Sequence, residues 1–197
     1  MFVSEIYEVE DCFRYDNAST DKTSNYSTVN LNSLTHSTDY YSAYRSLGSS
    51  PGSTYYSQIY VDETLPTNYE ISLDIWASNV TEIQSGICIS DSHPQTYTGT
   101  NQGLLVYQGS AKGLLYRNNG SLTRYDNTPG ISREAWYHFS MKVNGTSVTA
   151  VIKDSNNSSV YSVTQTLGNI QSWKKWNIQL GNNAHTIRWR NLKIKPL

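Results

Sequence analysis

The chain has 197 residues, of which 37% are hydrophobic, 12% are aromatic and only 16% are charged. This profile excludes a helical bundle, which would be rich in Ala, Leu, Glu and Lys, and it favours β-structure with polar turns. The formal net charge of -1 gives no broad basic footprint for nucleic acid. No apolar run reaches the length of a membrane span, so neither nucleic acid nor a bilayer core is an expected partner.

The beginning of the chain and its two cysteines say something about the cellular compartment. The opening "MFVSEIYEVEDCF" has no basic n-region followed by a long apolar run, so no signal peptide is predicted. We expect an extracellular or virion location: the protein is exported without such a peptide, is a virion component, or is part of a longer chain. Cys12 and Cys88 lie far apart, and either a disulfide between neighbouring strands or two buried free thiols fits the sequence.

Short strands are predicted along the first half of the chain. Residues 2–8 can form a strand, and residues 16–50 fit short strands joined by long polar loops. The stretch "YEISLDIWA" at 69–77 is a clean amphipathic strand, because its apolar residues alternate with Glu70, Ser72, Asp74 and Trp76. Further strands are expected at 55–61 and, as a buried strand, at 85–90.

A hairpin at 136–153, "WYHFSMKVNGTSVTAVIK", is the strongest local signal in the second half. Asn144-Gly145 predicts a two-residue type I′ turn. The predicted register pairs Val143 with Thr146 and Met141 with Val148, which puts the large apolar side chains on one face. The other strands of this half are expected at 103–109, 112–118, 122–125, 160–165, 176–181 and 187–194, the last with a bulge at Arg190-Asn191.

No helix is predicted, and about a dozen strands with frequent turns indicate one fold class. We expect an all-β, two-sheet antiparallel jelly-roll β-sandwich. Residues 1–197 are predicted to form a single domain, with strands and long polar loops at 1–54 and the sandwich core at 55–197.

The order of four segments resembles the concanavalin A-like lectin/glucanase superfamily, which includes laminin G-like domains. These segments are "YEISLDIWA", "SGICIS", the hairpin, and the closing "IQLGNNAHTIRWRNLKI". The resemblance implies two curved sheets whose concave outer face often receives a saccharide. The opening "EDCFRYDNASTDKTSNYST" is also similar to the start of such domains in phage tail proteins and methanogen surface proteins.

Catalysis is not expected, because the carboxylates of the glucanase members are missing. Those members carry a Glu-x-Asp-x-x-Glu-type motif on a central concave strand, and the corresponding "GLLVYQG" has no carboxylate. Glu70 and Asp74 share a strand face, but about 13 Å separates their backbones at about 3.3 Å per residue, which is too far for glycoside hydrolysis. His138 and Ser140 are neighbours on one strand face without a nucleophile elbow.

Aromatic and polar side chains on the outward faces are the candidates for a saccharide site. Trp76 is the leading one, because alternation points it away from the apolar face, although a covering loop would make it part of a small second core. Trp173 and Trp176 flank a strand start, where either both are structural or one packs and the other is exposed. Trp136 and Trp189 are assigned to the core or its edge. Tyr107, Gln108 and Arg117 are expected on adjoining strands, where they would supply stacking and hydrogen bonds on the same surface as Trp76 and His138. The full candidate set is Trp76, Asp74, Tyr107, Gln108, Arg117, His138 and Trp173.

No cofactor is expected. Calcium occurs in this superfamily, and Asp91, Asp126 and Asn127 lie in predicted loops, but their spacing is not that of a calcium loop.

The sequence therefore predicts a non-catalytic carbohydrate-binding module that recognises a host or cell surface. Its partner would be a glycan or cell-wall polysaccharide bound on the concave sheet face. One alternative is a virion or surface scaffold domain that contacts other proteins, and another is a glycoside hydrolase or polysaccharide lyase.

Overall fold

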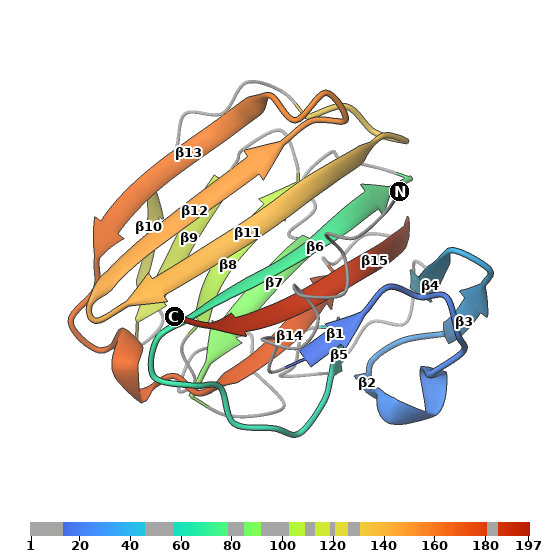
Figure 1. The fold of residues 1–197 in the computed structure, drawn as a ribbon, viewed down its shortest axis with the longest axis horizontal. Coiled ribbons are helices and arrows are strands. Elements are labelled where there is room, and N and C mark those ends of the chain that lie inside the picture. The colour runs from blue at the N-terminus through green and yellow to red at the C-terminus, as the bar shows by residue number, and fades with distance from the viewer. Residues whose placement is uncertain are drawn as a thin grey trace, which may run out of the picture.

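The structure is a computed structural model that describes residues 14–45, 57–78, 85–91, 103–108, 113–118, 121–125, 131–180 and 185–197. Two antiparallel sheets lie one over the other, as Figure 1 shows. The predicted all-β, two-sheet sandwich is confirmed. The described residues contain no α-helix, only the short 3-10 turns η1 (Thr23–Asn25) and η2 (Ile170–Ser172).

Sheet A is the nearer layer in Figure 1 and contains the predicted hairpin. Its strands run in the spatial order β13-β12-β11-β6-β15-β4-β3, and β1 also pairs with β15. Their bounds are β13 (Ser159–Thr166), β12 (Ser147–Lys153), β11 (Trp136–Asn144), β6 (Tyr69–Ala77), β15 (His185–Pro196), β4 (Tyr40–Arg45), β3 (Ser33–Ser37) and β1 (Arg14–Asp16).

Sheet B lies behind sheet A and has the spatial order β10-β9-β8-β7-β14-β5-β2. Residues 14–45 therefore contribute strands to both sheets. The bounds in sheet B are β10 (Ser121–Tyr125), β9 (Gly113–Asn118), β8 (Gly103–Gln108), β7 (Ser85–Ser90), β14 (Lys175–Leu180), β5 (Ser57–Tyr60) and β2 (Ser27–Val29).

The core lies between the two sheets and follows the alternation of the strands. On β6 the apolar side chains are at most 1% exposed, whereas Glu70, Asp74 and Trp76 on the opposite face are half-buried. Trp189 is fully buried, as expected. Cys88 is fully buried, while Cys12 and the strand expected at 2–8 lie outside the described residues. In the described part of the chain, no helix is long and apolar enough to cross a membrane.

The hairpin turn differs by one residue from the predicted one. Its loop is Gly145-Thr146, so Val143 pairs with Val148 and Asn144 with Ser147. Gly145 has a φ of +57° and Thr146 has no positive φ, which is the pattern of a type II′ turn and not of type I′. The apolar residues still share one face, because the pairing partners shift by two residues, a full period of the strand.

Two side chains distant in sequence contact this turn. The Asn68 carboxamide oxygen accepts the Gly145 N–H at 2.9 Å, and the Gln171 carboxamide donates to the Gly145 carbonyl. These contacts favour Gly145 as the first loop residue, which local turn preferences alone do not select.

Gly145→Ala is expected to lower the free energy of unfolding by about 1 kcal/mol, because alanine is strained at positive φ. The strain comes from the backbone alone, since a Cβ at Gly145 meets no atom within 4 Å. Gly168 is the matched control, because a Cβ there also meets nothing and its φ is ordinary. Urea denaturation of both variants checks this, and equal effects would contradict the role of φ.

Candidate functional site: a polar pocket on the outer face of sheet A

The outer face of sheet A carries two adjacent rows of side chains that cross its central strands. In the first row, Asp74 of β6 is paired with Arg190 of β15 and with His138 of β11. In the second row, Trp76 of β6 is paired with Arg188 and Trp136 in the same way. Strand alternation thus collects charged and aromatic groups from three strands on one surface.

Asp74 is the centre of the first row. Its Oδ1 lies 2.9 Å from His138 Nδ1, and its Oδ2 accepts from Asn191 Nδ2 at 2.8 Å and from Arg190 Nε at 3.4 Å. The predicted bulge explains how two consecutive residues of β15 reach one carboxylate. The register shifts between Arg190 and Lys193, and Asn191 has a φ of +55°.

The charge of Asp74 is stabilised by these partners. Burial alone would raise the pKa of Asp74, but the hydrogen bonds from His138 and Asn191, together with the electrostatic interactions with His138 and Arg190, outweigh it. The pKa of Asp74 is therefore lowered below its ordinary value. Since a carboxylate only accepts, His138 donates from Nδ1, and in the tautomer that this hydrogen bond selects Nε2 is an acceptor.

Asp74→Asn is expected to lower the free energy of unfolding by about 2 kcal/mol at pH 7. Because the pKa is lower in the folded state, the Asp74 carboxylate stabilises the protein above its ordinary pKa of about 4, and this contribution is lost as the pH falls further. Chemical denaturation of wild type and variant between pH 7 and pH 3 should show the two converging. Asp39→Asn, in an exposed turn, is the control and should change stability by less than about 0.5 kcal/mol.

A pocket of about 240 Å³ opens beside the first row. One wall is the turn between β12 and β13, which Asp154 shapes by accepting the N–H groups of Asn156 and Ser158, each at 2.9 Å. Lys153 donates to the Asn157 side chain at 3.0 Å across the same turn. The lining residues are Asp74, Trp136, Tyr137, His138, Asp154, Ser155, Asn157 and Arg190.

The aromatic rings of the site are stacked with guanidinium groups. Arg190 lies over the Trp136 ring with its Cζ 4.4 Å from the ring centroid. Arg188 lies over Trp76 at 4.2 Å and over Tyr40 at 4.9 Å. These contacts fix the orientation of both arginines. They also place Arg188 over one face of Trp76.

Three of the seven candidate residues come together here, namely Trp76, Asp74 and His138. The expectation that Tyr107, Gln108 and Arg117 share their surface is wrong, because β8 and β9 belong to sheet B. The resemblance places the segment "GLLVYQG", which contains β8, on the concave sheet. Because β8 belongs to sheet B and Trp76 lies on sheet A, the face that carries Trp76 belongs to the other sheet.

Trp173 is corrected from a candidate binding residue to a core residue. It is 2% exposed and Trp176 is fully buried, so both are structural, which is one of the two alternatives that the sequence left open. Trp173 follows the 3-10 turn η2, whose Ile170 is also buried, and this turn directs the side chain into the core.

The sequence did not identify Trp136, Arg190 or the β12–β13 turn as part of the site. Trp136 was assigned to the core or its edge, but it is half-buried on the outer face and lines the pocket. A signal for it was present, because Trp136 lies two residues from His138 and alternation gives both the same face.

The described residues contain no group of three or more His, Cys, Asp or Glu side chains arranged to hold a metal ion. Of the loop residues considered for calcium, Asp91 is exposed, and Asp126 and Asn127 lie outside the described part.

No family model and no curated protein matches the chain. Solved structures do match. The chain is similar to the lectin UEA-II complexed with galactose, with a TM-score of 0.65 and 7% identity over 92% of this chain and 97% of the lectin. It is also similar to the carbohydrate-binding module CBM66 from Bacillus subtilis, with a TM-score of 0.56 and 11% identity over 87% of this chain and 95% of the module.

A third similar structure is the GH43 protein BlXynB mutant (K247S) from Bacillus licheniformis, with a TM-score of 0.62 and 9% identity. That match covers 93% of this chain but only 39% of the GH43 protein. At these identities the likeness concerns the fold alone. The fold is therefore the concanavalin A-like jelly roll of the lectins, as the sequence resemblance implies.

Proposed function

We propose that this protein is a non-catalytic carbohydrate-binding module, and that its binding site is the pocket on the outer face of sheet A. One observation carries the proposal: a hydrogen-bond acceptor and a hydrogen-bond donor, each on a side chain held in place by its neighbours, lie together at one pocket. His138 keeps Nε2 as an acceptor, and the guanidinium of Arg190 has, among the described residues, only Asp74 as a hydrogen-bond partner. Adjacent hydroxyl groups of a sugar both donate and accept, so they match this pair.

The size and the walls of the pocket support a small polar ligand. A volume of about 240 Å³ is below the roughly 300–1,000 Å³ of pockets for drug-sized ligands, which favours a single sugar unit of a longer glycan. Trp136 supplies an apolar wall for sugar C–H groups. The lectin and carbohydrate-binding module with the same fold bind saccharides according to their names, which supports the same ligand class here.

The electrostatics of the pocket favour binding over hydrolysis. A glycoside hydrolase needs a carboxyl group whose pKa is raised so that it can donate a proton. The pKa of Asp74 is instead lowered, and one oxygen of Asp154 is engaged by two N–H groups of its own turn. Asp74 is therefore a positioning residue that orients His138 and Arg190.

The described surface gives less support to a scaffold domain that contacts proteins. Its exposed large hydrophobic residues are Tyr44 and Leu197, which lie on β4 and at the end of the chain. Extensive protein contacts usually use a contiguous apolar patch. A glycan of a cell surface or cell wall is the partner that fits the polar site better.

Trp136→Ala is expected to weaken glycan binding about tenfold or more, and His138→Ala by a similar factor. A glycan array selects the best ligand, and calorimetry then compares the variants. Tyr44→Ala is the matched control, because Tyr44 is an exposed aromatic residue outside the pocket lining and should leave the affinity unchanged. Unchanged affinity in Trp136→Ala would place the site elsewhere, and no binding to any polysaccharide would refute the proposal.

A further inference from the structure

Arg188 is a second cationic group on the outer face of sheet A, directly beside the pocket. It lies two residues from Arg190 on β15, roughly 7 Å along the strand, and alternation gives both side chains the same face. Its guanidinium contacts the Trp76 and Tyr40 rings at 4.2 and 4.9 Å. The group is therefore held in place before any ligand arrives.

The charge of Arg188 is not neutralised within the described part of the protein. Arg14 is paired with Glu63 and Arg190 with Asp74, whereas no described carboxylate lies within ion-pair distance of Arg188. Its Nε atom is buried and has no hydrogen-bond partner among the described residues. Partial burial of an unpaired guanidinium costs free energy, which an anion at this position would offset.

The stacked geometry determines what kind of anion fits. A guanidinium held over aromatic rings still has N–H groups along its edges, and one edge can bind two oxygen atoms of one oxyanion. The nearest carboxylate of the site, Asp74, accepts from His138, Asn191 and Arg190, so its charge is already compensated. Repulsion between Asp74 and an anion at Arg188 is reduced accordingly.

We propose that Arg188 binds an oxyanion substituent of the glycan, so that the preferred ligand is an acidic saccharide. The inference rests on the proposed function: His138 and Arg190 receive hydroxyl groups in the pocket, and Arg188 receives the charged group beside it. The oxyanion is the carboxylate of a uronic or sialic acid, or a sulfate ester, since both present two oxygens to one guanidinium edge.

The first test changes the ligand and leaves the protein intact. Oligogalacturonate, alginate oligosaccharide and sialyllactose are each compared by calorimetry with their carboxyl methyl esters, and sulfated dextran oligosaccharide with plain dextran oligosaccharide. At least one charged probe is expected to bind about tenfold or more tightly than its uncharged counterpart, and the preference should weaken with added salt. The carboxylate and sulfate arms show which oxyanion is recognised.

The second test changes the protein. Arg188→Gln should remove the preference for the charged probe and leave the affinity for the uncharged one within about twofold, whereas Arg188→Lys keeps the charge and should retain part of the preference. Near-ultraviolet circular dichroism checks that Trp76 and Tyr40 remain ordered, and Tyr44→Ala should keep the full preference.

The outcomes separate the inference from the function on which it rests. Equal affinities for charged and uncharged glycans overturn the role of Arg188 while the binding function stands. Tighter binding of poly-glutamate than of any acidic glycan also overturns it, because Arg188 would then serve an acidic polypeptide. If no glycan of either kind binds, the proposed function fails together with the inference.

Discussion

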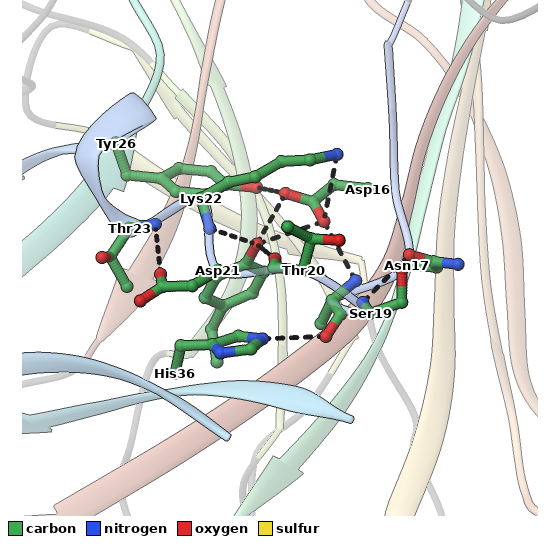
Figure 2. Close-up of polar contacts among 11 residues, drawn as sticks. Asp16, Asn17, Ser19, Thr20, Asp21, Lys22, Thr23, Tyr26 and His36 are labelled. Atoms are coloured by element: carbon green, nitrogen blue, oxygen red, sulfur yellow. Dashed lines mark hydrogen bonds and ion pairs between the residues drawn. The ribbon is translucent and has the colours of Figure 1, made fainter. Parts of the chain in front are cut away.

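Replacing Asp16 with alanine is expected to lower the free energy of unfolding by about 3 kcal/mol. Asp16 is only 3% exposed, and its carboxylate accepts a hydrogen bond from the hydroxyl of Tyr26 at 2.9 Å (Figure 2). It accepts another from the hydroxyl of Tyr41 at 3.1 Å. It also accepts the backbone N–H of Ala18 at 3.0 Å. Among the described residues it is the only hydrogen-bond partner of the Tyr26 hydroxyl, so its loss leaves that buried hydroxyl unsatisfied.

The same network supports the candidate site from the core side. Tyr41 stacks on Trp189 with ring centroids 5.3 Å apart, and Trp189 lies between Arg188 and Arg190 in the sequence of β15. Asp16 thus helps to hold β4 against β15 beneath the two arginines. We expect Asp16→Ala to weaken glycan binding as well as stability, because Tyr40 on β4 and Arg188 on β15 must stay in register to remain stacked.

Denaturation in urea measures the effect, and two neighbouring substitutions calibrate it. Tyr26→Phe removes the hydroxyl instead of its acceptor and should cost about 1 kcal/mol. Asn17→Ala removes a half-buried side chain that, among the described residues, accepts only the N–H of Ser19, and it should change stability by less than about 0.5 kcal/mol. A loss in Asp16→Ala no larger than that of Asn17→Ala would show that the carboxylate is dispensable.

The sequence predicts well those parts of the fold that follow from the alternation of side chains between the two faces of a single strand. Alternation identified β6 with both of its faces, and the change from a two-residue to a three-residue step between Trp189 and Leu192 identified the bulge of β15. The hairpin register failed because the turn is held by Asn68 and Gln171, and no local pattern reports such contacts.

For the candidate site, too, the sequence predicted only what alternation within a single strand determines. Alternation assigns a side chain to a face of its own strand, which brought Trp76, Asp74 and His138 together. It does not say to which sheet a strand belongs, and for that reason the positions on β8 and β9 were placed on the wrong surface. Alternation does not predict the burial of Trp173, which lies outside a strand. It also does not predict the hydrogen bonds of carboxylates whose partners are distant in sequence.

Glu63 is such a carboxylate, and Glu63→Ala is expected to lower the free energy of unfolding by about 3 kcal/mol. Its oxygens accept from Arg14 Nε at 2.7 and 2.8 Å and from the terminal guanidinium nitrogen at 2.6 Å. It also accepts the indole N–H of Trp176 at 2.6 Å. Removal leaves a half-buried guanidinium and a buried indole N–H without their acceptor.

A double-mutant cycle with Arg14→Ala isolates the pair. If the cost of Glu63→Ala comes mainly from stranding Arg14, the double variant should be less destabilised than the sum of the two single variants. Asp62→Asn is the matched control, because Asp62 also pairs with a cation, Lys175, but its side chain is 76% exposed. Its loss should be below about 0.5 kcal/mol, since an exposed ion pair contributes little.

The two carboxylates join the N-terminal segment to the sandwich at different places. Asp16 ties the end of β1 to β4 in sheet A, whereas Glu63 ties the start of β1 to Trp176 on β14 in sheet B. We expect the costs of Asp16→Ala and Glu63→Ala to add, because the two networks share no hydrogen-bond partner. A clear departure from additivity in the double variant would mean that residues 14–16 detach as a unit once either carboxylate is lost.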